Sequence, residues 1–337
     1  MFLCQPYPLA PFHQTSRSRI IMRVKNFDGP AGFLFTVGGV VGSIGSIMSK
    51  IRIGWIDHHL YTHHSQVFFP LIMDEIGQGK FEIVSAYESD RDPEKSDWCA
   101  EHHVHRAASP EEVVEASDVI LVISPNNPEA HLDLARVALA SGKPVYVDKY
   151  LAHTVEDARE MVQIARQHNT PLMTSSSLRF AKEVQELFAR VDGGFDYVYA
   201  RGMGRWRMYY GVHTIALALR AFGPHIKRLI DTGTELDRAV VLDDGARKCL
   251  IECHPCENQA DIFPWELGVR QGDVFDRAVV TDWDQFYKNL VKEYLQFFET
   301  KESPISLEEQ FATVAVEHAA EHSREQGGVW VDVARLD

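Results

Sequence analysis

Residues 51–64 read IRIGWIDHHLYTHH. The apolar run IRIGWI is typical of the buried first strand of a nucleotide-binding domain. The loop after such a strand normally carries glycines, because its backbone must turn tightly and approach a pyrophosphate. In this chain Asp57, His59 and Thr62 take the three glycine positions. The stretch therefore predicts the opening strand of a doubly wound domain whose phosphate loop departs from the usual pattern.

The sequence that follows alternates short apolar runs with amphipathic segments of helical period. The expected strands are FEIVSAY, SDVILVIS, PVYVDK and PLMTSS, and the expected helices are Phe68–Ile76, HLDLARVALASG and TVEDAREMVQIARQH. Parallel strands need crossover connections, so this alternation predicts a parallel sheet with helices on both faces. We expect residues 48–175 to form a doubly wound (Rossmann) domain of the dinucleotide-binding kind.

The character of the sequence changes after Arg179. Strand-like segments follow one another with little helix between them: FDYVYARGM, IKRLIDTG, RAVVLDDG, KCLIECH and RAVVTDW. This succession predicts a large, mostly antiparallel sheet. Two helices are expected to close the chain, over residues 283–299 and 307–322. The predicted fold class is α/β, with the Rossmann sheet followed by an α+β domain over residues 176–337 for substrate binding and oligomerisation.

The segment from Pro30 to Met48 is apolar, but its glycines weaken a helix and it is barely long enough to span a bilayer. The stretch MSKIRIGWID is a common opening for a cytoplasmic nucleotide-binding domain. We therefore expect residues 1–47 to be an unstructured extension or a mis-called start. The expected location is cytoplasmic, with no membrane partner.

The net charge of −14 argues against nucleic acid as a partner, because phosphate backbones are bound by clusters of Lys and Arg. Five cysteines, an odd number, favour a reducing compartment over a disulfide framework. Cys249, Cys253 and Cys256, with His254 among them, have the spacing of half a zinc site or an iron–sulfur triad. The segment is expected to be a strand, however, where a buried cysteine is commonly a small apolar residue.

Four stretches, in this order, resemble the Gfo/Idh/MocA oxidoreductases, the family of glucose-fructose oxidoreductase and inositol dehydrogenase. They are SPNNPEAHLDLARVALASGKPVYVDKYLA, SLRFAKEV, YYGVHTIALALRAFG and the tail that begins YKNLVKEYLQFFETKESPISLEEQ and ends GGVWVDV. The first is similar to the family's T-P-N segment and its E-K-P-L-A motif, and the third to its D-x-G-x-H-x-x-D helix. Together the four span roughly residues 50–335.

The resemblance implies an NAD(P)-dependent oxidoreductase that acts on a sugar, cyclitol or related polyol. It assigns the positions beside nicotinamide and substrate to Lys149 and His213. The chemistry agrees, because a hydride leaves a carbinol carbon only as a base takes the hydroxyl proton and a cation steadies the alkoxide. Tyr209 stands where the family has an aspartate, so Tyr209 or Tyr210 is expected to relay the proton.

NAD is the expected cofactor, with NADP as the alternative. Glu88 ends the second strand, where an acidic residue accepts hydrogen bonds from the ribose hydroxyls. The resemblance and the strand ends together give the expected cofactor-binding residues, which are Ile56, Asp57, His58, His59, Glu88, Ser124, Pro125, Asn126, His131, Asp148, Lys149 and Arg179.

The histidines after the first strand raise the question of a metal. His59 and His63 are four residues apart and could share one helical face, which would suit a transition-metal ion. They belong to no H-E-x-x-H motif, and we expect no bound metal. Partly protonated imidazoles at the start of a helix could instead bind an anion.

The segment GRWRMYYG supplies Arg205, Trp206 and Arg207 as expected substrate contacts, in addition to Lys149 and His213. The expected small-molecule partner is carbohydrate-like. Strands such as RAVVLDD and KCLIECH suggest burial on both faces of the second sheet, so a homodimer or homotetramer is expected.

Two other functions stay open at this point. A family member that has lost the dinucleotide could use the cleft, with or without a metal, for lyase or hydrolase chemistry on a carbohydrate. A non-catalytic binding protein could use the same scaffold. The segment around Lys149 favours an enzyme, whereas the missing glycines leave the choice between redox and non-redox chemistry open.

Overall fold

The computed structural model describes residues 49–337 except for residues 93 and 192 and the segments 207–209 and 256–263. The predicted extension over residues 1–47 lies outside the described residues. Among the residues described, no helix combines the length and the apolar character that a membrane span requires.

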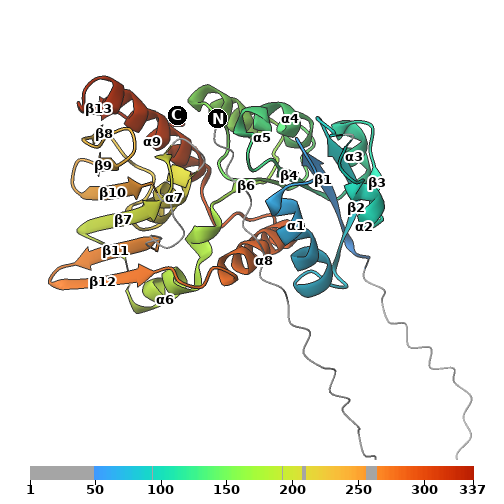
Figure 1. Ribbon diagram of the computed structural model, residues 1–337, viewed down its shortest axis with the longest axis horizontal. Coiled ribbons are helices and arrows are strands. Elements are labelled where there is room, and N and C mark those ends of the chain that lie inside the picture. The colour runs from blue at the N-terminus through green and yellow to red at the C-terminus, as the bar shows by residue number, and fades with distance from the viewer. Residues whose placement is uncertain (1–48, 93, 192, 207–209, 256–263) are drawn as a thin grey trace, which may run out of the picture. The chain divides into compact units, whose positions relative to one another are not determined.

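The first part of the chain forms the predicted doubly wound sheet (Figure 1). Its six strands pair in the order β3-β2-β1-β4-β5-β6, and every pair is parallel. The strand order reverses between β1 and β4, which places the ligand crevice of such a sheet outside the carboxyl ends of these two strands. The strands are β1 Ile51–Asp57, β2 Phe81–Glu88, β3 His105–Arg106, β4 Val119–Ile123, β5 Val145–Val147 and β6 Leu172–Thr174.

Helices cover both faces of this sheet. Alternate residues of β4 belong to two different core clusters. Ile120 and Val122 pack with residues of α3, α4 and α5. Leu121, the residue between those two in sequence, packs with residues of α1, α2 and α8. The helix α8 lies within the segment predicted as a second domain, yet it packs on the first sheet. The boundary between residues 175 and 176 stays a prediction. These helices are α1 His63–Pro70, α2 Trp98–His102, α3 Pro110–Ala116, α4 His131–Leu139, α5 Val155–Gln167 and α8 Gln285–Thr300.

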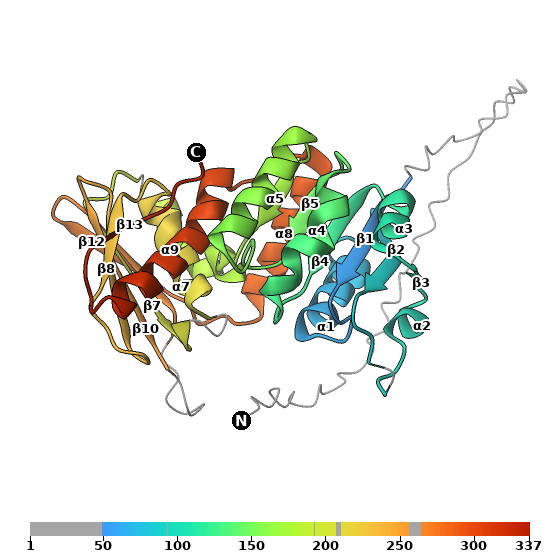
Figure 2. The ribbon, with the colours of Figure 1, turned by 90° about the horizontal axis from the view of Figure 1, so that it is seen from above.

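The second sheet has the strand order β12-β11-β7-β10-β9-β8-β13 and is mostly antiparallel, as predicted. β7 and β10 are the exception and pair in parallel. Figure 2 shows α7 and α9 on the same side of this sheet. The elements are β7 Tyr197–Met203, β8 Arg228–Asp231, β9 Arg238–Asp243, β10 Lys248–His254, β11 Glu266–Gln271, β12 Val274–Val279, β13 Val331–Asp332, α6 Lys182–Arg190, α7 Gly211–Phe222 and α9 Leu307–Glu325.

The cysteine pattern falls on β10. Cys249 and Cys253 are fully buried, and both lie with Ile251 in the core cluster. Burial raises the pKa of Cys253 to about 12, which keeps the thiol protonated. These two cysteines therefore pack as small apolar residues, and Cys256 lies outside the described residues.

Candidate active site

Lys149 lies directly beyond β5, at the carboxyl edge of the first sheet. The strand VYV is fully buried and delivers Asp148 and Lys149 into the same edge. Only 8% of Lys149 is exposed, and its Nζ donates to Pro125 O at 2.8 Å. Burial lowers the pKa of Lys149, although the charge of Asp148 opposes this effect. The lysine is thus held in the position that the sequence predicts, and it is easier to deprotonate than a surface lysine.

Asp148 and His64 form a buried carboxylate–imidazole pair. His64 Nδ1 lies 2.7 Å from Asp148 Oδ2, and the other carboxylate oxygen accepts the Lys149 N–H at 2.8 Å. Burial raises the pKa of Asp148, but the adjacent His64 and Lys149 outweigh it and lower the pKa to about 2. An ionised carboxylate fixes the ring orientation of the imidazole. Asp148, predicted to bind cofactor, is placed here as the partner of His64.

His213 lies in the first turn of α7, facing the same region. Its Nδ1 is 2.7 Å from Ser176 Oγ, so any proton exchange with a substrate would use Nε2. Burial lowers the pKa of His213 to about 3, and the charges of Lys149 and His64 act in the same direction. The imidazole is therefore neutral near pH 7. The exposed ring of Tyr210 is 6.1 Å from the His213 ring.

Tyr287 of α8 completes this group of side chains. Its ring centre is 5.8 Å from that of His63 and also 5.8 Å from that of His64. Burial raises the pKa of Tyr287, and the charge of Asp148 adds to the effect. The sequence reasoning did not identify His64 or Tyr287 as site residues. The histidine pair after β1 was a usable signal for His64, whereas Tyr287 is distant in sequence and carries no local motif.

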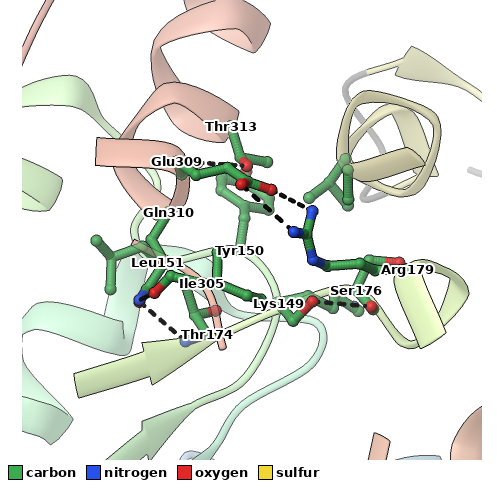
Figure 3. Close-up of a pocket in the computed structure, with 13 residues that line it drawn as sticks. Lys149, Tyr150, Leu151, Thr174, Ser176, Arg179, Ile305, Glu309, Gln310 and Thr313 are labelled. Carbon is green, nitrogen blue, oxygen red and sulfur yellow. Dashed lines mark hydrogen bonds and ion pairs between the residues drawn. The ribbon is translucent and has the colours of Figure 1, made fainter. Parts of the chain in front are cut away.

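A pocket opens beside Lys149 and Ser176 (Figure 3). Its volume is about 330 Å³ when the solvent-filled mouth is included. Figure 3 shows Arg179 pointing across it to Glu309 of α9, with which it forms an ion pair. On the other side, the Gln310 side chain accepts the Thr174 N–H at 3.0 Å and so ties α9 to the end of β6. Arg179, predicted to bind cofactor, is thus placed in a wall between the two sheets.

The loop after β1 is closed by its own side chains. Asp57 is fully buried; its Oδ1 accepts the His59 N–H at 3.2 Å and its Oδ2 accepts Trp55 Nε1–H at 3.3 Å. At the start of α1, Thr62 Oγ1 accepts the Ser65 N–H, and Ser65 Oγ accepts the Thr62 N–H. Some of the amides that a phosphate would use at a helix start are therefore already bonded within the chain.

Glu88 is also engaged by protein groups. Its two carboxylate oxygens accept the Leu60 N–H at 2.9 Å and the Arg106 guanidinium at 2.7 Å. Beside it lies a recess of about 250 Å³, lined by His59, Tyr61, Glu88, Arg91, Asp92, Lys95 and Ser96. A ribose bound in this recess would share Glu88 with the two existing donors.

The other predicted cofactor residues differ in how accessible they are. Ile56 is fully buried in β1, and Ser124 and Pro125 are buried after β4, whereas Asn126 is exposed. His131 is fully buried; its Nε2 lies 3.0 Å from Ser124 O and its Nδ1 lies 2.9 Å from Tyr150 O. His131 therefore fixes the loops after β4 and β5 relative to each other.

Two expectations require correction. His59 and His63 do not share a helical face, because α1 begins at His63 and His59 precedes its cap; the His59 ring lies instead beside His58 and Asp90. Trp206 is not placed as a substrate contact. The residue is 2% exposed, and the centre of its ring lies 4.9 Å from Arg238 Cζ. Its Nε1–H donates a hydrogen bond to the Glu317 carbonyl oxygen.

The remaining predicted contacts can be placed only in part. Arg205 is exposed on the segment that precedes α7. Arg207 and Tyr209 lie outside the described residues. Of the predicted catalytic residues, the structure brings together Lys149, His213 and Tyr210.

The residues around the crevice suit the two ends of a nicotinamide dinucleotide better than they suit its central diphosphate. The crevice beside Lys149 and His213 offers the proton-handling groups that a reacting nicotinamide and alcohol require, and the recess at the end of β2 offers the Glu88 carboxylate for a ribose. Between them, the Asp57–Thr62 loop has no glycine, and its amides are partly bonded to side chains. The two ends fit the group, and the diphosphate segment would have to be held differently from the glycine-loop arrangement.

Comparison with known proteins identifies one family model, described as an oxidoreductase family with an NAD-binding Rossmann fold (Gfo/Idh/MocA), which matches residues 39–176. The uncharacterised oxidoreductase YdgJ of Escherichia coli is 26% identical over 204 residues, which cover 54% of this chain and 56% of that protein. The 1,5-anhydro-D-fructose reductase of Ensifer adhaerens is 42% identical over 73 residues, 22% of each chain. The chain thus matches about half of the length of the first relative and less of the second.

A solved structure extends the likeness of fold to the second sheet. GenD2 from gentamicin A biosynthesis, in complex with NAD, superposes with a TM-score of 0.71 at 13% identity. The superposition covers 88% of this chain and all of that one. At this identity the likeness concerns the fold alone.

Proposed function

We propose that the protein, whose residues 39–176 match the model of the Gfo/Idh/MocA oxidoreductase family, transfers a hydride between NAD(P) and a sugar, cyclitol or related polyol. The observation that carries the proposal is the convergence of Lys149, His213 and the His64–Asp148 pair on one edge of the sheet. NAD is favoured over NADP, because Glu88 stands where a carboxylate would meet the ribose hydroxyls.

The pKa directions distinguish the roles of these groups. A hydroxyl that loses a hydride from its carbon must also lose its proton, and the best base has a pKa near the working pH. The pKa of His213, at about 3, makes its imidazole a weak base, whereas burial lowers the pKa of Lys149 from its ordinary value and makes the free amine easier to form. In this proposal Lys149 takes the hydroxyl proton and His213, fixed by Ser176, positions the hydroxyl through Nε2. The nicotinamide, when bound, supplies the hydride acceptor.

The His64–Asp148 pair supplies the carboxylate that is missing at position 209, where a tyrosine replaces the family's aspartate. An imidazole oriented by a buried carboxylate can pass a proton onward from the lysine and return to its starting state. Burial lowers the pKa of both His63 and His213, and the proximity of His64 acts in the same direction, which is consistent with all of these rings bordering one space. We therefore assign proton relay to His64 rather than to Tyr209 or Tyr210.

The carbohydrate class of the substrate rests on the relatives. One is named as a reductase of 1,5-anhydro-D-fructose, and the similar solved structure comes from biosynthesis of gentamicin A. A polyol presents the adjacent hydroxyls that Lys149, His213 and Ser176 would contact.

The test is a panel of sugars and cyclitols with NAD⁺ or NADP⁺, followed by absorbance of the reduced nicotinamide. With any responding substrate, Lys149→Met should lower kcat/KM by about 10²–10⁴-fold, the usual contribution of a general base. Lys182→Met is the matched control, because Lys182 is an exposed lysine on α6 whose partner is Glu186. Equal activity of the Lys149 variant and the control would contradict the assignment.

A second candidate function is favoured by the closed loop after β1. If Asp57, Thr62 and Glu88 keep their internal hydrogen bonds, the same Lys149 and His64 groups could serve a lyase or hydrolase reaction on a carbohydrate. That reaction needs no dinucleotide. Absence of NADH and NADPH binding would favour it over hydride transfer.

A further inference from the structure

We propose that His58, His59 and Asp90 form a binding site for a divalent transition-metal ion, of the zinc type, at the tips of β1 and β2. One ligand atom from each residue lies within 4.8 Å of the other two. Two imidazoles and one carboxylate are a donor set suited to Zn²⁺, Fe²⁺ and related ions. The proposal does not depend on the proposed redox function.

The backbone brings the three residues together. β1 and β2 pair in parallel with Asp57 opposite Glu88, so the chain leaves both strands at the same level. Two further hydrogen bonds continue the ladder past the strand ends, from Ser89 N to Asp57 O and from Asp90 N to His58 O. The ligand atoms are therefore carried by paired backbone and not by a free loop.

The hydrogen bonds of the two rings leave the same nitrogen of each for an ion. His59 Nδ1 is 2.5 Å from the Asp90 carbonyl oxygen, which can only accept, so Nδ1 carries the hydrogen and Nε2 carries the lone pair. His58 Nδ1 is 2.8 Å from Ser89 Oγ. Metal-binding histidines characteristically have their second nitrogen bonded in this way to a carbonyl or another polar group.

The distances fit an ion better than a direct ion pair. His58 Nε2 and His59 Nε2 lie 4.0 Å and 3.8 Å from Asp90 Oδ2, which is too far for a hydrogen bond. Zinc bonds of about 2.0–2.2 Å in a tetrahedron separate neighbouring ligands by roughly 3.3–3.5 Å. Each imidazole–carboxylate separation therefore exceeds that of a zinc site by less than an ångström.

The exposure of the residues indicates the type of site. The side chains of His58, His59 and Asp90 are 26%, 34% and 67% exposed. Three protein ligands at the surface leave a coordination position for water or another small ligand, as in open rather than closed zinc sites. His105 offers a contrast: it contacts Glu112 directly at 2.7 Å, as an ordinary exposed pair does.

The experiment uses the full chain, freed of metal with a chelator and then dialysed into metal-free buffer. Calorimetric titration with ZnCl₂ should show one saturable equivalent that the double variant H58A/H59A lacks. Asp90→Asn keeps both rings and their Nδ1 bonds, and it should weaken zinc binding by more than about tenfold. Cobalt(II) added instead of zinc should give visible absorption bands in the wild type that the double variant does not show.

His105→Ala is the matched control and should bind zinc as the wild type does. Absence of a saturable equivalent in the wild type would overturn the site. The site would also be overturned if H58A/H59A still bound one full equivalent of zinc, or if the His105 variant lost zinc binding to the same extent as H58A/H59A. No dinucleotide is present in this titration, so its outcome is separate from that of the NAD(P) proposal.

Discussion

At the scale of single residues, the candidate site depends on charges that burial has placed side by side. Asp148 is fully buried yet keeps its pKa near 2, because His64 and Lys149 lie next to it. Removing one partner of such a pair leaves an uncompensated buried charge, which is costly, whereas removing both is much less so. Lys149 and His213 have their pKa values lowered in the same space.

The first prediction concerns the pair itself. Asp148→Asn and His64→Asn should each lower the free energy of unfolding by about 3 kcal/mol, and the double variant should lose about 2 kcal/mol less than the sum. Urea denaturation of the four proteins measures this coupling. Asp118→Asn is the control, since its partner Arg52 is half exposed and the pair should contribute below about 1 kcal/mol. Additive losses would show that His64 and Asp148 are not coupled.

The sequence could predict some of these residues and not others. Lys149 follows an apolar strand within a recognisable motif, so its place at the crevice follows from local pattern alone. The His64–Asp148 contact joins residues 84 apart, and no local spacing reveals it. Trp206 was predicted as a substrate contact because aromatic and Arg side chains suit a sugar site. In the structure it is buried and packs under the Arg238 guanidinium, a contact that no local pattern reveals.

At the scale of elements, strands were predictable where one face is clearly apolar and less so where charges are buried. β10, KCLIECH, matches its predicted segment, and its alternation is visible in its burial. β11, ELGVRQ, was not predicted, because it begins with Glu266, which is buried only through contacts with Tyr199, Arg201 and Arg277. α1 begins five residues before the predicted Phe68, at the capping box of Thr62 and Ser65.

The second prediction concerns the end of β9. The hydrogen bond from Lys248 lowers the pKa of Asp243 to about 2, and Gly245 N–H and Arg228 act in the same direction. A carboxyl whose folded pKa is depressed contributes stability above its unfolded pKa, near 3.9, and loses it as the pH falls toward 2. Asp243→Asn should therefore cost about 1 kcal/mol at pH 7, after allowance for the half-exposed partners, and almost nothing at pH 2.

Chemical denaturation of the wild type and Asp243→Asn between pH 2 and pH 7 checks this. Asp237→Asn serves as the control, because Asp237 is a largely exposed carboxyl directly before β9. A stability difference that stays constant across the pH range would contradict the linkage.

At the scale of the whole molecule, the second sheet presents an apolar row on the face opposite α7 and α9. Ile230, Val241, Leu250 and Tyr199 lie opposite one another across β8, β9, β10 and β7, and each is partly exposed. The exposed ring of Phe275 stacks on the ring of Tyr199, with 6.0 Å between the two ring centres. A row of this kind is a suitable surface for a second copy of the chain.

From this row we propose that the protein forms a homodimer or homotetramer through the second sheet. Leu250→Glu places a charge at the centre of the row and should shift the protein to a monomer in light scattering coupled to size exclusion. Val329→Glu, at an exposed apolar position near the end of α9, is the control and should leave the assembly unchanged. A monomeric wild type, or an unchanged Leu250 variant, would count against this surface.

The central claim is that the crevice beside Lys149 admits a nicotinamide dinucleotide although the loop after β1 lacks glycine. Calorimetric titration of the full chain with NADH and with NADPH, each with and without chelator, tests it most directly. The account predicts saturable binding of one NADH per chain, tighter than NADPH. A correctly folded protein that gives no saturable heat with either nucleotide would contradict it.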